Sequence, residues 1–215
     1  MGISNLSADL MYALPGQTKE MWVQSLEEMM TLNPQHLSCY ALIVNEDTPF
    51  GALDAKGLLP RPDEDEEMEM QDITARVLQK HGLYQYEVSN YAKPGFASRH
   101  NVGYWVRRDY IGLGCAAHSL QGNVRRANVI GLEEYIRGEC MESEEALSAE
   151  DAAFEELMVG LRMVEGVEIT PYAMDLFAEK LKKQEARGLL TVKERRVRLT
   201  KRGFDVMNAV LAELM

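Results

Sequence analysis

The sequence predicts an α/β fold in its first part and a small winged-helix-like α+β domain at its end. Two observations carry this prediction. Two apolar runs of strand length flank a capped helix near the start, and amphipathic helices alternate with short strand-like segments in the last third. With 215 residues, 46% of them hydrophobic, the chain has material for one sizeable core or two modest ones.

The first part is predicted to be a strand, a helix and a second, parallel strand. Residues 5–12 and 37–44 are the two apolar runs, and between them Thr18 can cap a helix that ends before Pro34. Strands joined by a crossover helix are parallel in a right-handed β-α-β unit. Because nothing precedes the first strand, we expect it to leave an unpaired edge that favours self-association.

A second helix and strand are predicted to follow. Asp63 can cap a helix with Glu66 in the capping-box position, so the acidic run at 64–67 is a helix start and not a metal site. His81 and Gly82 end this helix, and residues 84–89 alternate as a strand. We place this first domain at residues 1–95.

Residues 96–143 form an aromatic and glycine-rich connecting region, and residues 144–215 the terminal domain. Ser148 opens one amphipathic helix and Pro171 a second. Two alternating segments, 190–193 and 196–199, form the wing before a last helix from Lys201.

Composition favours a cytoplasmic protein. The formal charge of −11 argues against nucleic acid or an anionic membrane as the partner of the whole molecule. Cys39, Cys115 and Cys140 are widely spaced, which indicates a reducing compartment and not a disulfide framework. No apolar stretch is long enough for a transmembrane segment.

Five blocks of the sequence form a characteristic set: Asp9–Thr18, Leu37–Tyr40, Tyr86–Ala92, His100–Trp105 and Tyr110–Ser119. Together, and in this order, they resemble the oxygen-independent coproporphyrinogen III oxidase family of radical S-adenosylmethionine proteins. The phrase His100–Trp105 (HNVGYW) is more typical of the haem-chaperone branch of that family.

The resemblance implies the carboxy-terminal part of a partial (β/α)6 barrel that binds S-adenosylmethionine and a [4Fe-4S] cluster, followed by the terminal domain. Asp9 matches a carboxylate that contacts S-adenosylmethionine, and Ala41, Leu42 and Ile43 match the wall beside its adenine. Judged from the residues alone, Asp9 is more simply a buried acid satisfied by backbone amides.

One departure from the family pattern concerns the cluster. Three closely spaced cysteines hold such a cluster, and this chain has no CxxxCxxC motif. We therefore expect this chain alone to hold no [4Fe-4S] cluster or cofactor firmly and to be inactive as an enzyme.

His100 is the candidate haem ligand. A neutral imidazole is a good axial ligand for haem iron, and the rings of Tyr104 and Trp105 can pack on a porphyrin. The alternative is a partly buried histidine bonded to backbone in an aromatic cluster. His118 has no second ligand at metal spacing, so we interpret it as structural.

The predicted function is haem binding and transfer to a recipient protein, in haem and porphyrin metabolism. One alternative is a true coproporphyrinogen III oxidase, which decarboxylates propionates oxidatively. Another is a winged-helix nucleic-acid-binding module, because residues 179–203 contain ten Lys or Arg and three acids. Such a basic run is also compatible with a solvated face or with docking on acidic groups of the same chain.

Overall fold

The computed structural model describes Gly2 and residues 4–215. Its contacts divide the chain into an amino-terminal unit, Met1–Ser98, and a carboxy-terminal unit, Arg99–Met215. The junctions that the sequence places after residues 95 and 143 stay predictions.

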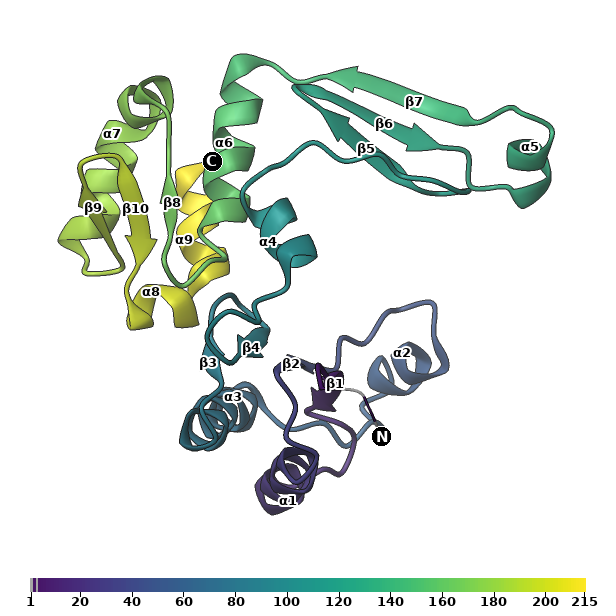
Figure 1. Ribbon diagram of the computed structural model, residues 1–215, viewed down its shortest axis with the longest axis vertical. Coiled ribbons are helices and arrows are strands. Elements are labelled where there is room, and N and C mark those ends of the chain that lie inside the picture. Colours follow the sequence, from purple (N-terminus) through teal and green to yellow (C-terminus); the bar gives the residue numbers. More distant parts are fainter. Residues whose placement is uncertain (1, 3) are drawn as a thin grey trace. The chain divides into compact units, whose positions relative to one another are not determined.

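The amino-terminal unit is a mixed sheet with helices (Figure 1). Its strand order is β1-β2-β4-β3, in which β1 and β2 are parallel and β4 is antiparallel to both of its neighbours. This confirms the predicted β-α-β unit and leaves β1 at the sheet edge; self-association through that edge stays a prediction. In chain order the elements are β1 (Ser7–Tyr12), α1 (Lys19–Met30), β2 (His36–Ala41), α2 (Pro49–Asp54), α3 (Glu64–Lys80), β3 (Tyr84–Gln85) and β4 (Asn90–Ala92).

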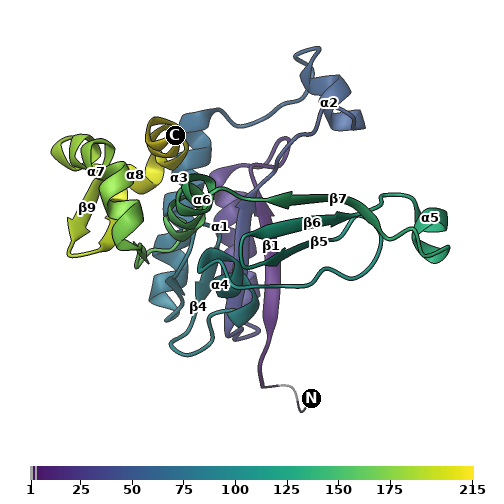
Figure 2. The same ribbon diagram turned by 90° about the horizontal axis from the view of Figure 1, so that it is seen from above.

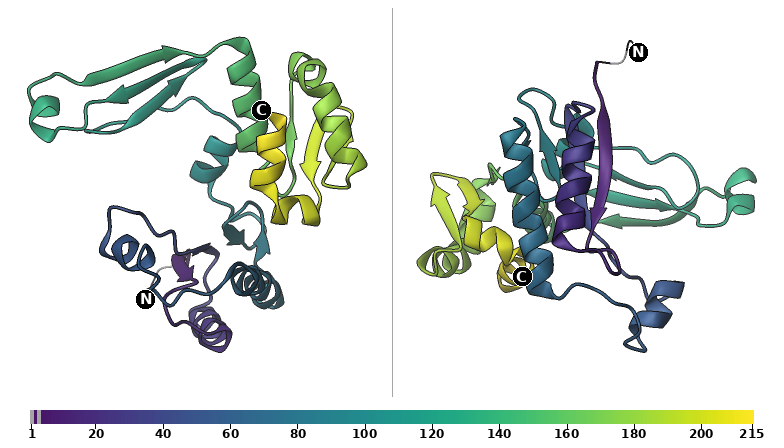
Figure 3. Two further views of the ribbon diagram at one scale, coloured as in Figure 1. Left: turned by 180° about the vertical axis from the view of Figure 1, so that it is seen from behind. Right: turned by 90° about the horizontal axis from the view of Figure 1, so that it is seen from below.

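Helices α1 and α3 lie side by side against one face of this sheet (Figures 2 and 3). The core between them is centred on Trp22, which is 1% exposed and whose indole nitrogen donates to Thr74 Oγ1 at 2.9 Å. Alternate residues of β1 point into this core, with Leu10 and Tyr12 packed against it. The other face of β1 therefore carries the intervening residues, which include Asp9.

The predicted start of each of these two helices is confirmed. Thr18 caps α1 through its side chain, and Asp63 and Glu66 form the capping box of α3. The predicted strand over residues 84–89 is wrong in its middle. The chain instead folds back as the β3–β4 hairpin, with the buried Glu87 accepting from the backbone N–H of Ser89 inside the turn.

The carboxy-terminal unit contains two antiparallel sheets and a group of helices (Figure 1). Its elements are α4 (Arg99–Trp105), β5 (His118–Gln121), β6 (Val124–Asn128), α5 (Leu132–Ile136), β7 (Met141–Ala146), α6 (Ala149–Gly160), β8 (Val167–Glu168), α7 (Pro171–Ala186), β9 (Leu190–Lys193), β10 (Arg196–Leu199), α8 (Lys201–Asp205) and α9 (Met207–Leu214).

The sheet β5-β6-β7 extends away from α6, with α5 at its far end (Figure 1), and it was not predicted. Strands β5 and β6 turn at Gly122, whose φ of 59° suits glycine. The acidic β7 has little intrinsic strand preference, but it pairs with the basic β6, where Arg126 bonds the opposite Glu144 at 2.6 Å.

The winged-helix-like end is confirmed in its main elements. Ser148 caps α6, Pro171 is the first residue of α7, and the predicted wing is the β9–β10 pair. Strand β8 adds a third member to this sheet. The predicted last helix begins at Lys201 but breaks at Val206, where the backbone leaves helical geometry, and continues as α9.

Candidate functional site

The sheet face opposite α1 and α3 carries Asp9, the residue matched to S-adenosylmethionine contact. Asp9 lies opposite Ser38 in the β1–β2 register, and its side chain is exposed. Asp9 is therefore not a buried acid satisfied by backbone amides. An exposed carboxylate is free to accept hydrogen bonds from a ligand.

His36 lies on the same face of β2, but it is only 7% exposed. Hydrogen bonds of 2.9 Å join its Nδ1 to Ser7 Oγ and its Nε2 to the Tyr86 hydroxyl. Burial lowers the pKa of His36 below its ordinary value of 6.5, and the nearby Asp9 carboxylate opposes this shift. His36 is therefore neutral at pH 7, with both ring nitrogens engaged.

The three residues matched to the adenine wall lie at the end of β2. Ala41 is the last residue of the strand and packs toward the core, so its side chain lies on the opposite face from Asp9. Leu42 continues the parallel pairing through its N–H to the carbonyl of Tyr12 at 2.9 Å, and Ile43 is 79% exposed. The structure does not bring the Ala41 side chain together with Asp9.

A different group of side chains gathers around α4 in the carboxy-terminal unit. His100 and Tyr104 are four residues apart and share one helix face, with ring centroids 5.0 Å apart in an edge-on arrangement. Tyr110 extends the stack, with its ring centroid 4.8 Å from that of Tyr104. The backbone of Tyr110 is fixed by two hydrogen bonds with the backbone of Leu120 in β5.

The end of α4 brings Arg108 back to this cluster. Arg107 has a φ of 52°, and the N–H groups of Arg107 and Arg108 donate to the carbonyls of Tyr104 and Gly103. These two bonds are those of a Schellman motif, which reverses the chain at a helix end. The Arg108 side chain lies beside Gly103, where a Cβ would be in ordinary van der Waals contact with Arg108 Cδ at 3.8 Å.

Helix α4 is held against α6 by charged and aromatic contacts. Arg107 Nε donates to Glu155 at 3.1 Å, and Arg125 also pairs with Glu155. The guanidinium of Arg162 lies 5.3 Å from the ring centroid of Trp105. Trp105 is thus engaged by Arg162, while Tyr104 faces His100.

Two hollows of about 190 and 490 Å³ open beside this cluster. They adjoin each other, because His100, Tyr104, Arg108 and Tyr110 line both. The imidazole of His100 is exposed, and within the described residues it has no hydrogen-bond partner. The alternative of a partly buried histidine bonded to backbone is therefore wrong for His100.

Tyr110 is less suited than His100 to bind a metal. Burial, and then the neighbouring Tyr104, raise the pKa of the Tyr110 hydroxyl above its ordinary value of 10. A tyrosine ligates iron as the phenolate, which this shift disfavours at neutral pH. The free imidazole is the better ligand in this cluster.

The remaining histidines and cysteines offer no comparable site. His81 pairs with Glu27 at 2.9 Å, and His118 is an exposed residue on β5. Among the described residues, no group of three or more His, Cys, Asp or Glu side chains is placed to hold a metal ion. Cys39 is buried, Cys115 half-buried and Cys140 exposed.

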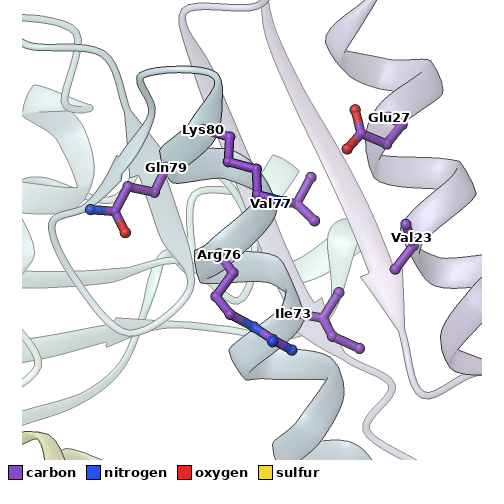
Figure 4. Close-up of a pocket in the computed structure, with 7 residues that line it drawn as sticks. All are labelled: Val23, Glu27, Ile73, Arg76, Val77, Gln79 and Lys80. Atoms are coloured by element: carbon purple, nitrogen blue, oxygen red, sulfur yellow. The ribbon is translucent and has the colours of Figure 1, made fainter.

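A further hollow of about 660 Å³ lies between α1 and α3 (Figure 4). Val23 of α1 faces Ile73 and Val77 of α3, with Glu27 and Lys80 on the rim. None of the residues predicted to bind a ligand lines it, and it holds no chemically distinctive group.

The basic run of the terminal domain is largely paired within that domain. Lys183 and Arg187 bind Glu213 at 2.9 and 2.6 Å, and Arg195 binds Glu168 at 2.6 Å. These contacts match the interpretation that the charges dock on acidic groups of the same chain. They reduce the free positive charge that a nucleic acid requires.

The chain is similar to known proteins along its whole length. Residues 147–206 match the family described as the HemN C-terminal domain. The heme chaperone HemW of Bacillus subtilis is 36% identical over the entire chain, and that of Escherichia coli is 32% identical over 98% of it. The chain belongs to the HemN/HemW family. It corresponds to the carboxy-terminal portion of that family and spans about 60% of the length of these relatives.

An animal protein and a solved structure are also similar to this chain. The mitochondrial radical S-adenosyl methionine domain-containing protein 1 of Danio rerio is 31% identical over 98% of the chain and 52% of its own length. The coproporphyrinogen III oxidase HemN of Escherichia coli, a radical SAM enzyme, superposes with a TM-score of 0.76. That match covers 99% of this chain and 55% of HemN at 20% identity, so it establishes the α/β fold alone.

Sequence reasoning identified His100 but missed Arg99, Arg108 and Tyr110, which line the hollows beside it. An arginine at the first residue of this aromatic helix and another three residues after its end, in an acidic chain, were a usable signal. What was missing was the Schellman turn, which brings Arg108 next to α4.

Within the described residues, no helix is both long enough and apolar enough to cross a bilayer.

Proposed function

We propose that this chain binds haem through His100 and forms part of a haem chaperone that passes haem to a recipient protein. The observation that carries the proposal is the exposed imidazole of His100, which lines two adjoining hollows and has no hydrogen-bond partner in the described part of the chain. Curated relatives matched along nearly the whole chain are named heme chaperones, which supports the same function.

Haem is the cargo in this proposal, and each group of the cluster has a defined part. The His100 nitrogen donates its lone pair to the iron, which requires the neutral imidazole. The rings of Tyr104 and Tyr110 offer apolar surface to the porphyrin. Because Arg107 is tied to Glu155, α4 is fixed on α6 and the imidazole is presented from a firm support.

Contact with S-adenosylmethionine is a second part of the proposal, for a longer protein that also holds the cluster. Asp9 is exposed on the edge strand β1 and fits a ligand that donates hydrogen bonds. Residues Ala41, Leu42 and Ile43 would contribute through their backbone, since Ala41 packs its side chain the other way. The cysteines of this chain supply no cluster, so we expect it to be inactive alone.

Titration with hemin tests the haem proposal. The wild-type chain should give the Soret shift of histidine ligation, and His100→Ala should abolish it while leaving the helical circular dichroism unchanged. His118→Ala is the matched control, because His118 is an exposed histidine in the same unit. An unchanged spectrum in His100→Ala, or equal losses in both variants, would overturn the proposal.

A further inference from the structure

The hollows beside His100 are lined by an excess of positive charge. Their walls include three arginines, Arg99, Arg107 and Arg108, and two acids, Asp109 and Glu155. The chain as a whole carries −11, so this is a local reversal of its charge. Such a reversal favours a ligand that brings negative charge to this surface.

The two acids are already engaged by groups of the protein. Glu155 pairs with both Arg107 and Arg125. Asp109 accepts a hydrogen bond of 2.8 Å from the backbone N–H of Gly122. By contrast, Arg99 and Arg108 are exposed, and neither has an ion pair or hydrogen-bonded side-chain partner among the described residues.

The donors that a ligand in these hollows can reach are the exposed guanidiniums of Arg99 and Arg108. Two further donors, the indole nitrogen of Trp105 and Nη2 of Arg107, have no acceptor in the described part of the chain, but both atoms are buried. Exposed and unpaired guanidiniums are the complement of a carboxylate.

We propose that Arg99 and Arg108 bind the propionate carboxylates of haem, so that this site recognises porphyrins by their carboxylate edge. This inference rests on the proposed haem binding and specifies which part of the haem molecule the site recognises. Both arginines line the smaller hollow together with His100, the proposed ligand of the iron. A guanidinium can bind a carboxylate through two parallel hydrogen bonds.

The test compares hemin with its dimethyl ester, which keeps the iron and the ring but carries no carboxylates. Both are titrated into the full chain by the Soret band, in wild type and in the double variant Arg99→Gln/Arg108→Gln. Wild type should bind hemin at least about tenfold more tightly than the ester, because the ester cannot form charged hydrogen bonds with the two guanidiniums. The double variant should lose this preference, and added salt should weaken only the hemin complex.

Arg202→Gln is the matched control, since Arg202 is an exposed arginine of the same unit that lines neither hollow. It should keep the wild-type preference. Equal affinity for hemin and ester, with His100-dependent ligation of both, would overturn this inference and leave the proposed function standing. No His100-dependent ligation of either compound would overturn both.

Discussion

The imidazoles of two histidines in this chain differ in both burial and hydrogen bonding. His36 is buried on the sheet of the amino-terminal unit, and both of its ring nitrogens are hydrogen-bonded. His100 is exposed on α4 of the carboxy-terminal unit and has no such partner among the described residues. A metal ligand needs a free nitrogen lone pair, so residue type alone does not define a site. The surroundings assign a structural role to His36 and make His100 available for binding.

The thiols show the same contrast and give the largest expected effect. Burial raises the pKa of the Cys39 thiol to about 12, and Cys39 is 4% exposed, whereas Cys140 is exposed. Since the thiolate is the reactive form, iodoacetamide at about pH 8 should modify Cys39 at least about 1000-fold more slowly than Cys140. Mass spectrometry of the peptides measures both rates. They should converge in concentrated urea, and similar rates in the native protein would contradict the buried sheet core.

Removing each imidazole should separate the two histidines by stability. His36→Ala removes one hydrogen bond from Ser7 and one from Tyr86 and should lower the free energy of unfolding of the amino-terminal unit by about 2 kcal/mol. His100→Ala removes an exposed side chain and should change stability by less than about 0.5 kcal/mol. Trp22 and Trp105 are the two tryptophans, one in each unit. Urea unfolding followed by Trp22 fluorescence in a Trp105→Phe background therefore reports the first unit; equal losses would remove the distinction.

The pH dependence of the amino-terminal unit should be a smaller effect. The pKa of folded His36 lies below the 6.5 of an ordinary histidine, so the unfolded chain binds more protons between these two values. The contribution of His36 to the free energy of unfolding should be complete above about pH 6.5 and should decrease as the pH is lowered. It should stop changing below the pKa of folded His36. His36→Gln should remove this component. An undiminished slope in that variant, measured by urea unfolding at several pH values, would assign the effect to other groups.

Much of the fold follows from local signals in the sequence. Thr18, Asp63 and Ser148 each cap the helix predicted for them, because a cap depends on only a few neighbouring residues. The parallel β1–β2 pair follows from the chirality of crossover connections. The wing follows from alternation on both sides of a short turn.

The elements that escaped prediction depend on contacts between distant residues. Strand β7 pairs with β6, and Glu144 of β7 bonds Arg126 of β6 across the two strands, a contact that the composition of β7 alone does not indicate. The alternating residues 84–89 do not continue as one strand, since the chain turns around the buried Glu87. At the candidate site, the motif identified His100, while its exposure and its arginine neighbours depend on the turn after α4.

Chemical rescue of the missing ligand tests the central claim most directly. His100→Gly loaded with hemin should lack the spectrum of histidine ligation, and added imidazole should restore it at the vacated position. His36→Gly, treated in the same way, should keep the wild-type spectrum before and after imidazole is added. We expect imidazole to restore the spectrum in the His100 variant alone. The imidazole concentration that saturates this rescue should be lower than the concentration that saturates hemin in the absence of protein. Histidine-type ligation that persists in His100→Gly without imidazole would contradict it.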